Sequence, residues 1–217
     1  MREQMTALER FLKYITFDTQ SEEGAEATPS TEKQRALGRV LARELAEMGL
    51  EGACLADNGA VYGWLPATPG REDVPVIALI AHMDTAPRVP GGPVKARGVS
   101  YEGGVLVLSE EKGIALSPAA FPDLLEQVGK QLVVTDGTTL LGADDKAGVA
   151  EIFAAVERLV RDPQLAHGRV AVCITPDEEV GRGADYVDLA RLGAAFAYTV
   201  DGGPLGTLEY ENFNAAA

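Results

Sequence analysis

The chain is poor in sulfur and imidazole side chains. Its 217 residues include only two cysteines and two histidines. Cys54 and Cys173 lie far apart, each in or near an apolar, strand-like stretch, so we expect free thiols that are buried in the fold. Free thiols suit a reducing compartment, and we therefore expect a cytoplasmic protein.

Long hydrophobic runs are also missing. No apolar segment approaches the ~20 residues of a membrane-spanning helix. The N-terminal stretch "MREQMTALERFLKYITF" carries charges throughout and lacks the apolar centre of a signal peptide. The sequence thus predicts neither a signal peptide nor a membrane partner.

Positive charge is scarce. Lysine and arginine total 19 against 33 aspartate and glutamate residues, which gives a formal net charge of −14. Because phosphate binding needs a basic surface, this balance argues against a nucleic-acid partner. Clustered carboxylates can instead hold cations.

What the chain does contain are apolar segments of two kinds. Some are short apolar runs, which predict strands, and others have apolar residues three to four positions apart, which predicts helices. Strands alternating with helices predict an α/β fold with a largely parallel sheet, and the Gly- and Pro-rich residues 89–130 predict an excursion from it. We expect helices over 3–16, over 32–50 with Thr31 as N-cap, over the later part of 142–162 and over 183–193. We expect strands over 59–67, 74–82, 130–135, 168–175 and from 195 as a last core strand.

Three apolar strands end in a polar cluster, and a fourth cluster lies in a loop that leads into a helix. Ligands of open α/β sheets bind outside the carboxyl ends of the strands, so we expect these clusters to converge. Converging negative charge is unfavourable unless a cation neutralises it, which favours a metal site. The clusters are His82 with Asp84, Asp144 with Asp145, Asp177 with Glu178 and Glu179, and Asp201.

The residue types narrow the chemistry of this site. One imidazole with several carboxylates favours zinc, manganese or cobalt over calcium or magnesium. Asp84 lies two residues after His82, on the same side of a strand, so it can accept the ring N–H and fix the tautomer. Of the adjacent Glu178 and Glu179, one would bind metal and the other would take a proton from water.

Each of these residues also has a plainer interpretation. A histidine at the end of a core strand can be structural, and the aspartates can be turn or helix-capping residues. A run such as "DEE" is often a solvated turn. Lys146 and Arg182 could be ion-pair partners within the acidic cluster, and His167, in a polar connection, is expected to be structural or exposed.

Four stretches carry a resemblance to a known family: "ALIAHMDTAP", "LLGADDKAGVAEI", "ITPDEEVGRGA" and "YTVDGGPLGTLEYENFNAA". In this order, and over nearly the whole chain, they resemble the co-catalytic zinc peptidases, and within them the tripeptide-cleaving aminopeptidases. The resemblance implies an α/β, three-layer catalytic domain with a mixed, mostly parallel sheet flanked by helices.

The resemblance also implies a ligand set for two zinc ions in a complete site. His82 and Asp201 would bind the first zinc, Asp144 would bridge the two, and Glu179 would bind the second. The peptide bond between Asp144 and Asp145 is often cis in such proteins.

The same resemblance implies two catalytic roles and a substrate. Asp84 would orient the imidazole of His82, and Glu178 would be the general base. The expected reaction is hydrolysis that releases the N-terminal residue of a tripeptide substrate.

The chain departs from the family in length. Members are roughly twice as long, so we expect residues 1–206 to be the N-terminal part of the catalytic domain and 207–217 the start of a lid (dimerisation) domain. The histidine of the second zinc and the lid residues that bind substrate would then be absent. We expect one tighter and one weaker or empty metal position, weak or no activity, and self-association through an exposed sheet edge.

Three alternatives remain open. The chain could resemble another exo-acting dipeptidase, carboxypeptidase or deacylase of the same family, although "TPDEEVGRG" and "NFNAA" argue against this. It could be a metal-binding module without catalysis. A dinucleotide-binding domain is disfavoured because "GADDKAG" lacks the G-x-G-x-x-G pattern.

Overall fold

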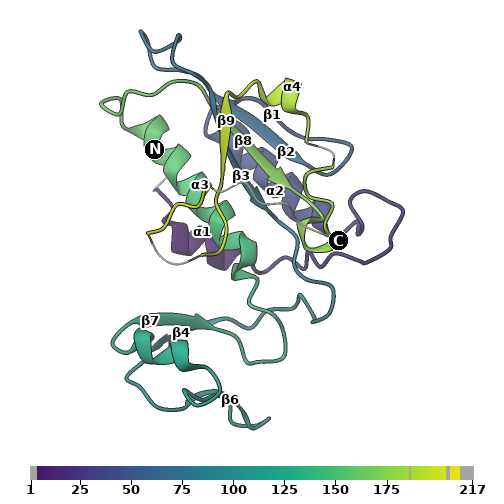
Figure 1. Cartoon of the computed structure of the whole chain (residues 1–217), viewed down its shortest axis with the longest axis vertical. Helices are drawn as coiled ribbons and strands as arrows, with labels where there is room; N and C mark the ends of the chain where they lie inside the picture. Colours follow the sequence, from purple (N-terminus) through teal and green to yellow (C-terminus); the bar gives the residue numbers. More distant parts are fainter. Residues whose placement is uncertain (1–3, 186, 204–205, 211–217) are drawn as a thin grey trace.

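The computed structural model describes residues 4–185, 187–203 and 206–210. They form one five-stranded sheet, a layer of helices and a small separate excursion (Figure 1). The helices are α1 (Ala7–Tyr14), α2 (Gln34–Glu47), α3 (Ala143–Arg161) and α4 (Leu189–Leu192), with 3-10 turns η1 (Pro122–Gln127) and η2 (Glu178–Val180). The strands are β1 (Glu51–Leu55), β2 (Val61–Leu65), β3 (Ile77–His82), β4 (Arg97–Ser100), β5 (Leu106–Ser109), β6 (Ile114–Leu116), β7 (Gln131–Val134), β8 (Val170–Thr175) and β9 (Phe196–Thr199).

The main sheet has the strand order β1-β2-β8-β3-β9. Strands β8, β3 and β9 run parallel, whereas β2 pairs with β8, and β1 with β2, in antiparallel fashion. All six residues of β8 are buried, as expected of a continuous apolar run in the middle of a sheet. The α/β class and the mixed sheet are therefore confirmed.

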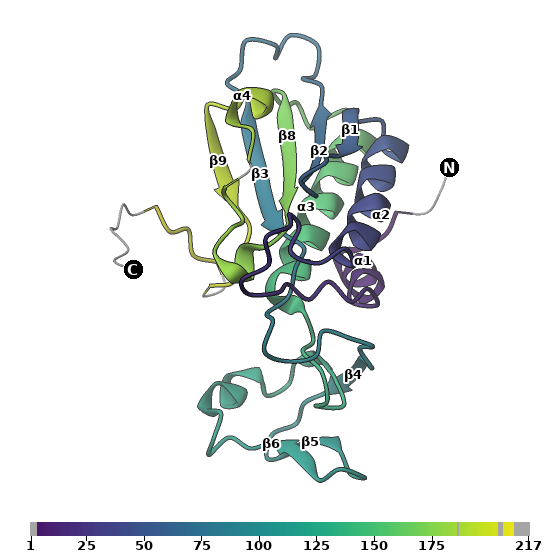
Figure 2. The same ribbon diagram turned by 90° about the vertical axis from the view of Figure 1, so that its right-hand side faces the viewer.

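Helices cover the two faces of this sheet unequally. Helices α1, α2 and α3 lie together on one face, as Figure 2 shows. Leu37, Leu41 and Phe153 are fully buried there in the main core. Among the described residues, the only α-helix on the other face is the short α4, whose Leu192 belongs to a second core cluster with Tyr62, Trp64 and small residues of the sheet such as Ala78.

A buried ion network ties the three helices of the thick layer together. Arg10 of α1 is 4% exposed and binds both Glu44 of α2 and Glu157 of α3. Tyr14 donates its hydroxyl hydrogen to Glu44, at 2.7 Å. This network thus joins the three helices that cover one face of the sheet.

The predicted excursion is confirmed and is longer than expected. Strands β4 and β7 form one two-stranded sheet and β5 and β6 another, below the main sheet in Figure 1. They share a small core of Tyr101, Leu106, Leu124 and Val134. The strand predicted at 130–135 is β7, which pairs with β4 rather than with the main sheet.

Several local predictions are wrong. In the first helix, Leu8 and Leu12 recur at helical spacing with Phe11 and Ile15, which predicts one buried face, but they are 53% and 39% exposed. Thr31 does not cap α2, whose N-cap is Lys33; instead the Thr31 hydroxyl donates to the carbonyl of Gln20. The helix expected over 183–193 is only the four-residue α4.

The last strand differs most from its prediction. β9 was expected in the core because "FAYTV" is apolar, but it is an edge strand whose four residues are all exposed. Strand β1 was not predicted at all. Of the segment predicted as the start of a lid domain, residues 211–217 lie outside the described residues.

Both cysteines are free thiols, Cys173 buried and Cys54 partly buried. Among the described residues, no helix combines the length and the apolar character that a membrane crossing requires.

Candidate metal centre

The candidate site lies where the parallel strands end. His82 is the last residue of β3 and sits beside Thr175, the last residue of β8. Glu178 and Glu179 follow β8 in the turn η2, and Asp201 follows β9. Because these three strands run in the same direction, their carboxyl ends meet at one edge of the sheet.

Three carboxylates surround one nitrogen of His82. Its Nε2 atom lies 2.9 Å from Oδ1 of Asp144, 3.7 Å from Oε2 of Glu178 and 3.9 Å from Oδ2 of Asp201. The imidazole is 2% exposed, whereas the side chains of Asp144 and Glu178 are 70% and 54% exposed. The structure thus brings the predicted polar clusters together around one imidazole that faces an open rim.

Asp84 holds the other side of the same ring. Its carboxylate is fully buried, with Oδ1 3.3 Å from Nδ1 of His82. The two carboxylate oxygens also accept the backbone N–H groups of Glu178, at 3.0 Å, and Glu179, at 3.2 Å. Asp84 therefore fixes both the imidazole and the turn that carries the two glutamates.

Asp145 has a position that sequence reasoning did not anticipate. Its carboxylate accepts the backbone N–H of His82 and that of Gly148, each at 3.1 Å, and it is 2% exposed. It links the end of β3 to the beginning of α3. The preceding Asp144–Asp145 peptide bond is cis.

Burial and the crowding of negative charge shift the pKa values of several site residues. Burial disfavours the charged imidazole, but the hydrogen bond and charge of Asp84, with further acids nearby, outweigh it and raise the pKa of His82 to about 10. Burial raises the pKa of Asp145 to about 8. Partial burial, followed by the charge of Asp144, raises the pKa of Glu179.

The two cations considered as partners of the acidic cluster have other contacts. Lys146 is fully buried and donates from Nζ to the carbonyl of Phe17, at 2.9 Å. Burial lowers the pKa of this lysine to about 8. Arg182 donates to the carbonyls of Ala25 and Ala27 in the loop between α1 and α2.

His167 lies far from this site. It precedes β8, at the end of the strand opposite to Glu178, and its Nδ1 faces the carbonyl of Gly168 at 2.8 Å. Since the sequence has only two histidines, the site contains a single imidazole.

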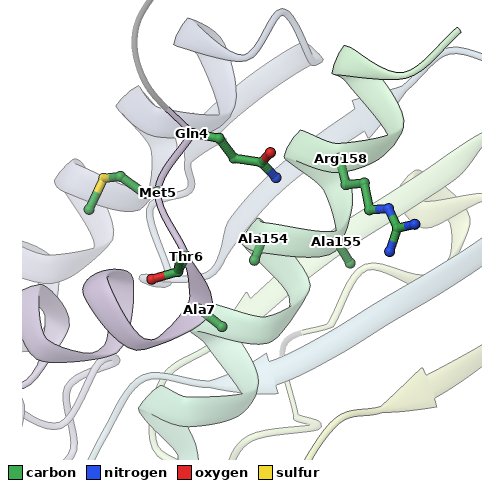
Figure 3. A pocket seen from close by; sticks show the side chains of 7 residues that line it. All are labelled: Gln4, Met5, Thr6, Ala7, Ala154, Ala155 and Arg158. Atoms are coloured by element: carbon green, nitrogen blue, oxygen red, sulfur yellow. The ribbon is translucent and has the colours of Figure 1, made fainter.

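Two cavities differ sharply in chemistry. One, of about 490 Å³, opens beside His82, Glu178 and Asp201 and continues along an apolar wall that includes Ile80 and Val187. The other, of about 430 Å³, lies between the N-terminal segment and α3 (Figure 3). Arg158 is the one charged residue among the seven that line the second cavity, so it offers no set of metal ligands.

The residues present fit a zinc ion. Ligand atoms about 2.1 Å from a tetrahedral zinc are about 3.4 Å from one another. The distances from Nε2 of His82 to Asp144 and Asp201 bracket this value, at 2.9 and 3.9 Å. One set of ligand atoms from His82, Asp145 and Asp201 also lies within 4.8 Å of one another.

Comparison with solved structures defines the class of fold. The chain superimposes on an aminopeptidase PepT from Bacillus cereus with a TM-score of 0.63 at 27% identity, covering 92% of this chain and 44% of that one. It superimposes on a tripeptidase from Staphylococcus aureus with a TM-score of 0.61 at 25% identity, covering 93% and 44%. The fold is that of the catalytic domains of zinc peptidases.

Curated sequences narrow the similarity to one protein, peptidase T. The chain is 55% identical over 212 residues to peptidase T of Desulfitobacterium hafniense and 53% identical over 211 residues to that of Clostridium acetobutylicum. These matches cover 97% of this chain but 51% and 52% of the relatives, so the chain spans about half their length. No protein-family profile matches the chain.

Proposed function

We propose that the chain carries the first metal position and the general base of a zinc-dependent aminopeptidase that releases the N-terminal residue of tripeptides. The observation that carries the proposal is the gathering of three carboxylates around Nε2 of His82. The similarity to peptidase T supports the reaction and the substrate class. The alternative of a purely structural histidine is disfavoured because such a histidine would not need this concentration of charge.

His82, Asp144 and Asp201 would hold the first zinc ion. Asp144 suits a ligand better than Asp145, because both oxygens of Asp145 already accept backbone N–H groups. The side chain of Asp144 is instead 70% exposed and lies 2.9 Å from the imidazole. Zinc bound there would act as a Lewis acid and lower the pKa of water.

Glu178 is the proposed general base. Its carboxylate is at the open side of the site, 3.7 Å from the imidazole, and its backbone is fixed by Asp84. From there it can accept a proton from the attacking water and pass that proton to the leaving amine. Asp84 has no such access, since it is fully buried, and its proposed role is to orient His82.

A second zinc position would have fewer ligands from this chain. Asp144 would bridge to it and Glu179 would bind it, while the remaining histidine, His167, lies at the opposite end of β8. We therefore propose one tight and one weak position, and low activity for the chain by itself. Two equally tight sites in calorimetric titration with zinc would contradict this part of the proposal.

The test joins zinc content to hydrolysis of a tripeptide with a free amino group. Glu178→Gln should lower the rate by about 10²–10⁴-fold while zinc content stays unchanged, because a general base is lost and the first ligands are not. Glu151→Gln, on the exposed side of α3, is the matched control and should change neither.

Two outcomes would count against the proposal. Failure of the wild-type chain to bind zinc would remove its basis. Equal hydrolysis of tripeptides with free and acetylated amino groups would point to a reaction other than aminopeptidase cleavage.

A further inference from the structure

The turn after β8 is fixed from inside the protein by Asp177. This residue is 1% exposed and has a φ of 59°, the one positive φ of a residue other than glycine in the described part of the chain. Aspartate and asparagine tolerate this left-handed conformation better than most residues do. The conformation turns the chain directly before Glu178 and Glu179.

The buried carboxylate of Asp177 is fully used in hydrogen bonds to a distant segment. It accepts the N–H of Ser30 at 2.7 Å, the hydroxyl of Ser30 at 2.5 Å and the side-chain amide of Gln34 at 2.7 Å. In return, the N–H of Asp177 donates to Oε1 of Gln34 at 3.2 Å. Hydrogen bonds to an ionised carboxylate are among the stronger ones in proteins.

Arg182 holds the other side of the same turn. Its guanidinium donates to the carbonyls of Ala25 and Ala27 and to the hydroxyl of Thr28, and its backbone N–H donates to the carbonyl of Asp177 at 2.9 Å. The loop between α1 and α2 is thereby bound to both sides of the turn. These contacts join segments more than 140 residues apart.

We propose that Asp177 is a positioning residue, whose buried carboxylate locks the turn against Ser30 in the loop between α1 and α2 and against Gln34 at the start of α2, and so orients Glu178 and Glu179. This inference rests on the proposed function, which makes Glu178 the general base and Glu179 a zinc ligand. The hydrogen bonds of the Asp177 carboxylate do not involve His82 or the other proposed ligands. Its side chain bonds instead to Ser30 and Gln34.

Two substitutions of Asp177 distinguish the effect of its carboxylate from the effect of its backbone conformation. Asp177→Asn keeps the size and tolerates a positive φ, but it removes the charge and turns an amide NH₂ toward hydrogen-bond donors. Asp177→Gly removes the side chain while favouring the same backbone conformation. If the carboxylate orients the turn, both variants release it; if the conformation alone matters, Asp177→Gly keeps it in place.

Amide hydrogen exchange by NMR gives a reading that needs no metal. The N–H groups of Glu178 and Glu179 are bonded to Asp84 and should be protected. In both variants their exchange should become about tenfold faster relative to the amides of β8, because an anchoring bond to a charged group is lost. Glu157→Gln, a buried acid of the helical layer, is the control and should change exchange in the turn and in β8 alike.

Cobalt(II) binding, followed by visible absorption, gives the second reading. The variants should bind the ion with an altered spectrum, whereas Glu157→Gln should keep that of the wild-type chain. Unchanged relative exchange in Asp177→Gly would overturn the inference, even if cobalt binds normally and the proposed function stands.

A different result would distinguish the locking of the turn from the proposed function. A wild-type chain that takes up no cobalt but loses turn protection in the variants would refute the proposed function and keep the locking of the turn. If Asp177→Asn fails to fold, Ser30→Ala replaces it, since it removes one of the bonds to Asp177 and leaves the others. Turn protection that is unchanged in Ser30→Ala and in Asp177→Gly would then overturn the inference.

Discussion

At the scale of single residues, Asp84 is the side chain on which the arrangement of the site depends most. It contacts the ring of His82 and two backbone N–H groups of the glutamate turn with one buried carboxylate. Carboxylates behind a metal-binding histidine usually set the ring orientation and the basicity of the ligand nitrogen. Removing the charge should therefore weaken metal binding without removing any ligand.

We expect Asp84→Asn to weaken zinc affinity by about 10–100-fold, the usual cost of losing such a partner. Competition with a chelator of known affinity measures this change. Asp162→Asn, which alters an acid that accepts the N–H of Gln164 beyond α3, is the control and should leave the affinity unchanged. An unaltered affinity in Asp84→Asn would show that His82 needs no orienting partner.

Which of these residues the sequence could reveal depends on how local their signals are. His82 ends one apolar strand and Glu178 follows another, so their meeting at one sheet edge follows from the α/β topology, and Asp144 joins them from the beginning of α3. Asp177 and Asp145 have roles that no local signal distinguishes. Within "DEE" three acids look alike, and only the fold shows that the first turns inward to residues 30 and 34.

At the scale of elements, helix α3 approaches β9 closely at Gly148. A Cβ atom at this position would lie 2.0 Å from the carbonyl oxygen of Val200 and 2.3 Å from Oδ1 of Asp145. Both neighbours are fixed, one as backbone beside Asp201 and the other by its bond to the N–H of His82. Glycine is thus required at position 148, because there α3 lies directly against the end of β9 and against the carboxylate that bonds the end of β3.

We expect Gly148→Ala to destabilise the chain by about 1–3 kcal/mol, because overpacking outweighs the helix preference of alanine. Gly38→Ala in α2 is the matched control. Its Cβ would meet the end of the flexible Leu55 side chain, so the usual gain of about 0.5–1 kcal/mol should largely remain. Urea denaturation measures both, and a stabilised Gly148→Ala would refute the close approach.

The elements also show where periodicity misleads. Leu8, Phe11, Leu12 and Ile15 recur at a spacing that is typical of one buried helix face, but α1 packs mainly on α3 and leaves Leu8 and Leu12 at the surface. The apolar "FAYTV" predicted a core strand, although its place at the edge depends on strand order, which no local pattern encodes. Whether a segment forms a helix or a strand was therefore easier to predict than which elements it packs against.

At the scale of the whole molecule, β9 is a sheet edge with aromatic side chains. Phe196 and Tyr198 are 50% and 40% exposed and pack edge to face, with ring centres 5.7 Å apart. On the outer side of β9, the described residues provide no pairing strand. Exposed apolar edges of this kind promote association between copies.

We expect sedimentation velocity to detect concentration-dependent self-association of the chain. Tyr198→Lys should weaken it by about tenfold, since about 1.4 kcal/mol of buried aromatic contact corresponds to that factor. Leu12→Lys is the control, because Leu12 is similarly exposed, at 39%, but belongs to α1 in the helical layer. Equal weakening by both variants would mean that association does not use the β9 edge.

The excursion that contains β4 to β7 departs from the main domain after Asp84 and returns to it before Asp144. It has a core of its own, and the contacts that hold His82 and Asp84 come from α3, β3 and the turn after β8. Two parts of one metal centre are thus separated in the sequence by a segment that supplies none of the site side chains described above. Such a segment can change in length or content while the centre stays intact, so the fold offers a place where new recognition can be added without rebuilding the chemistry.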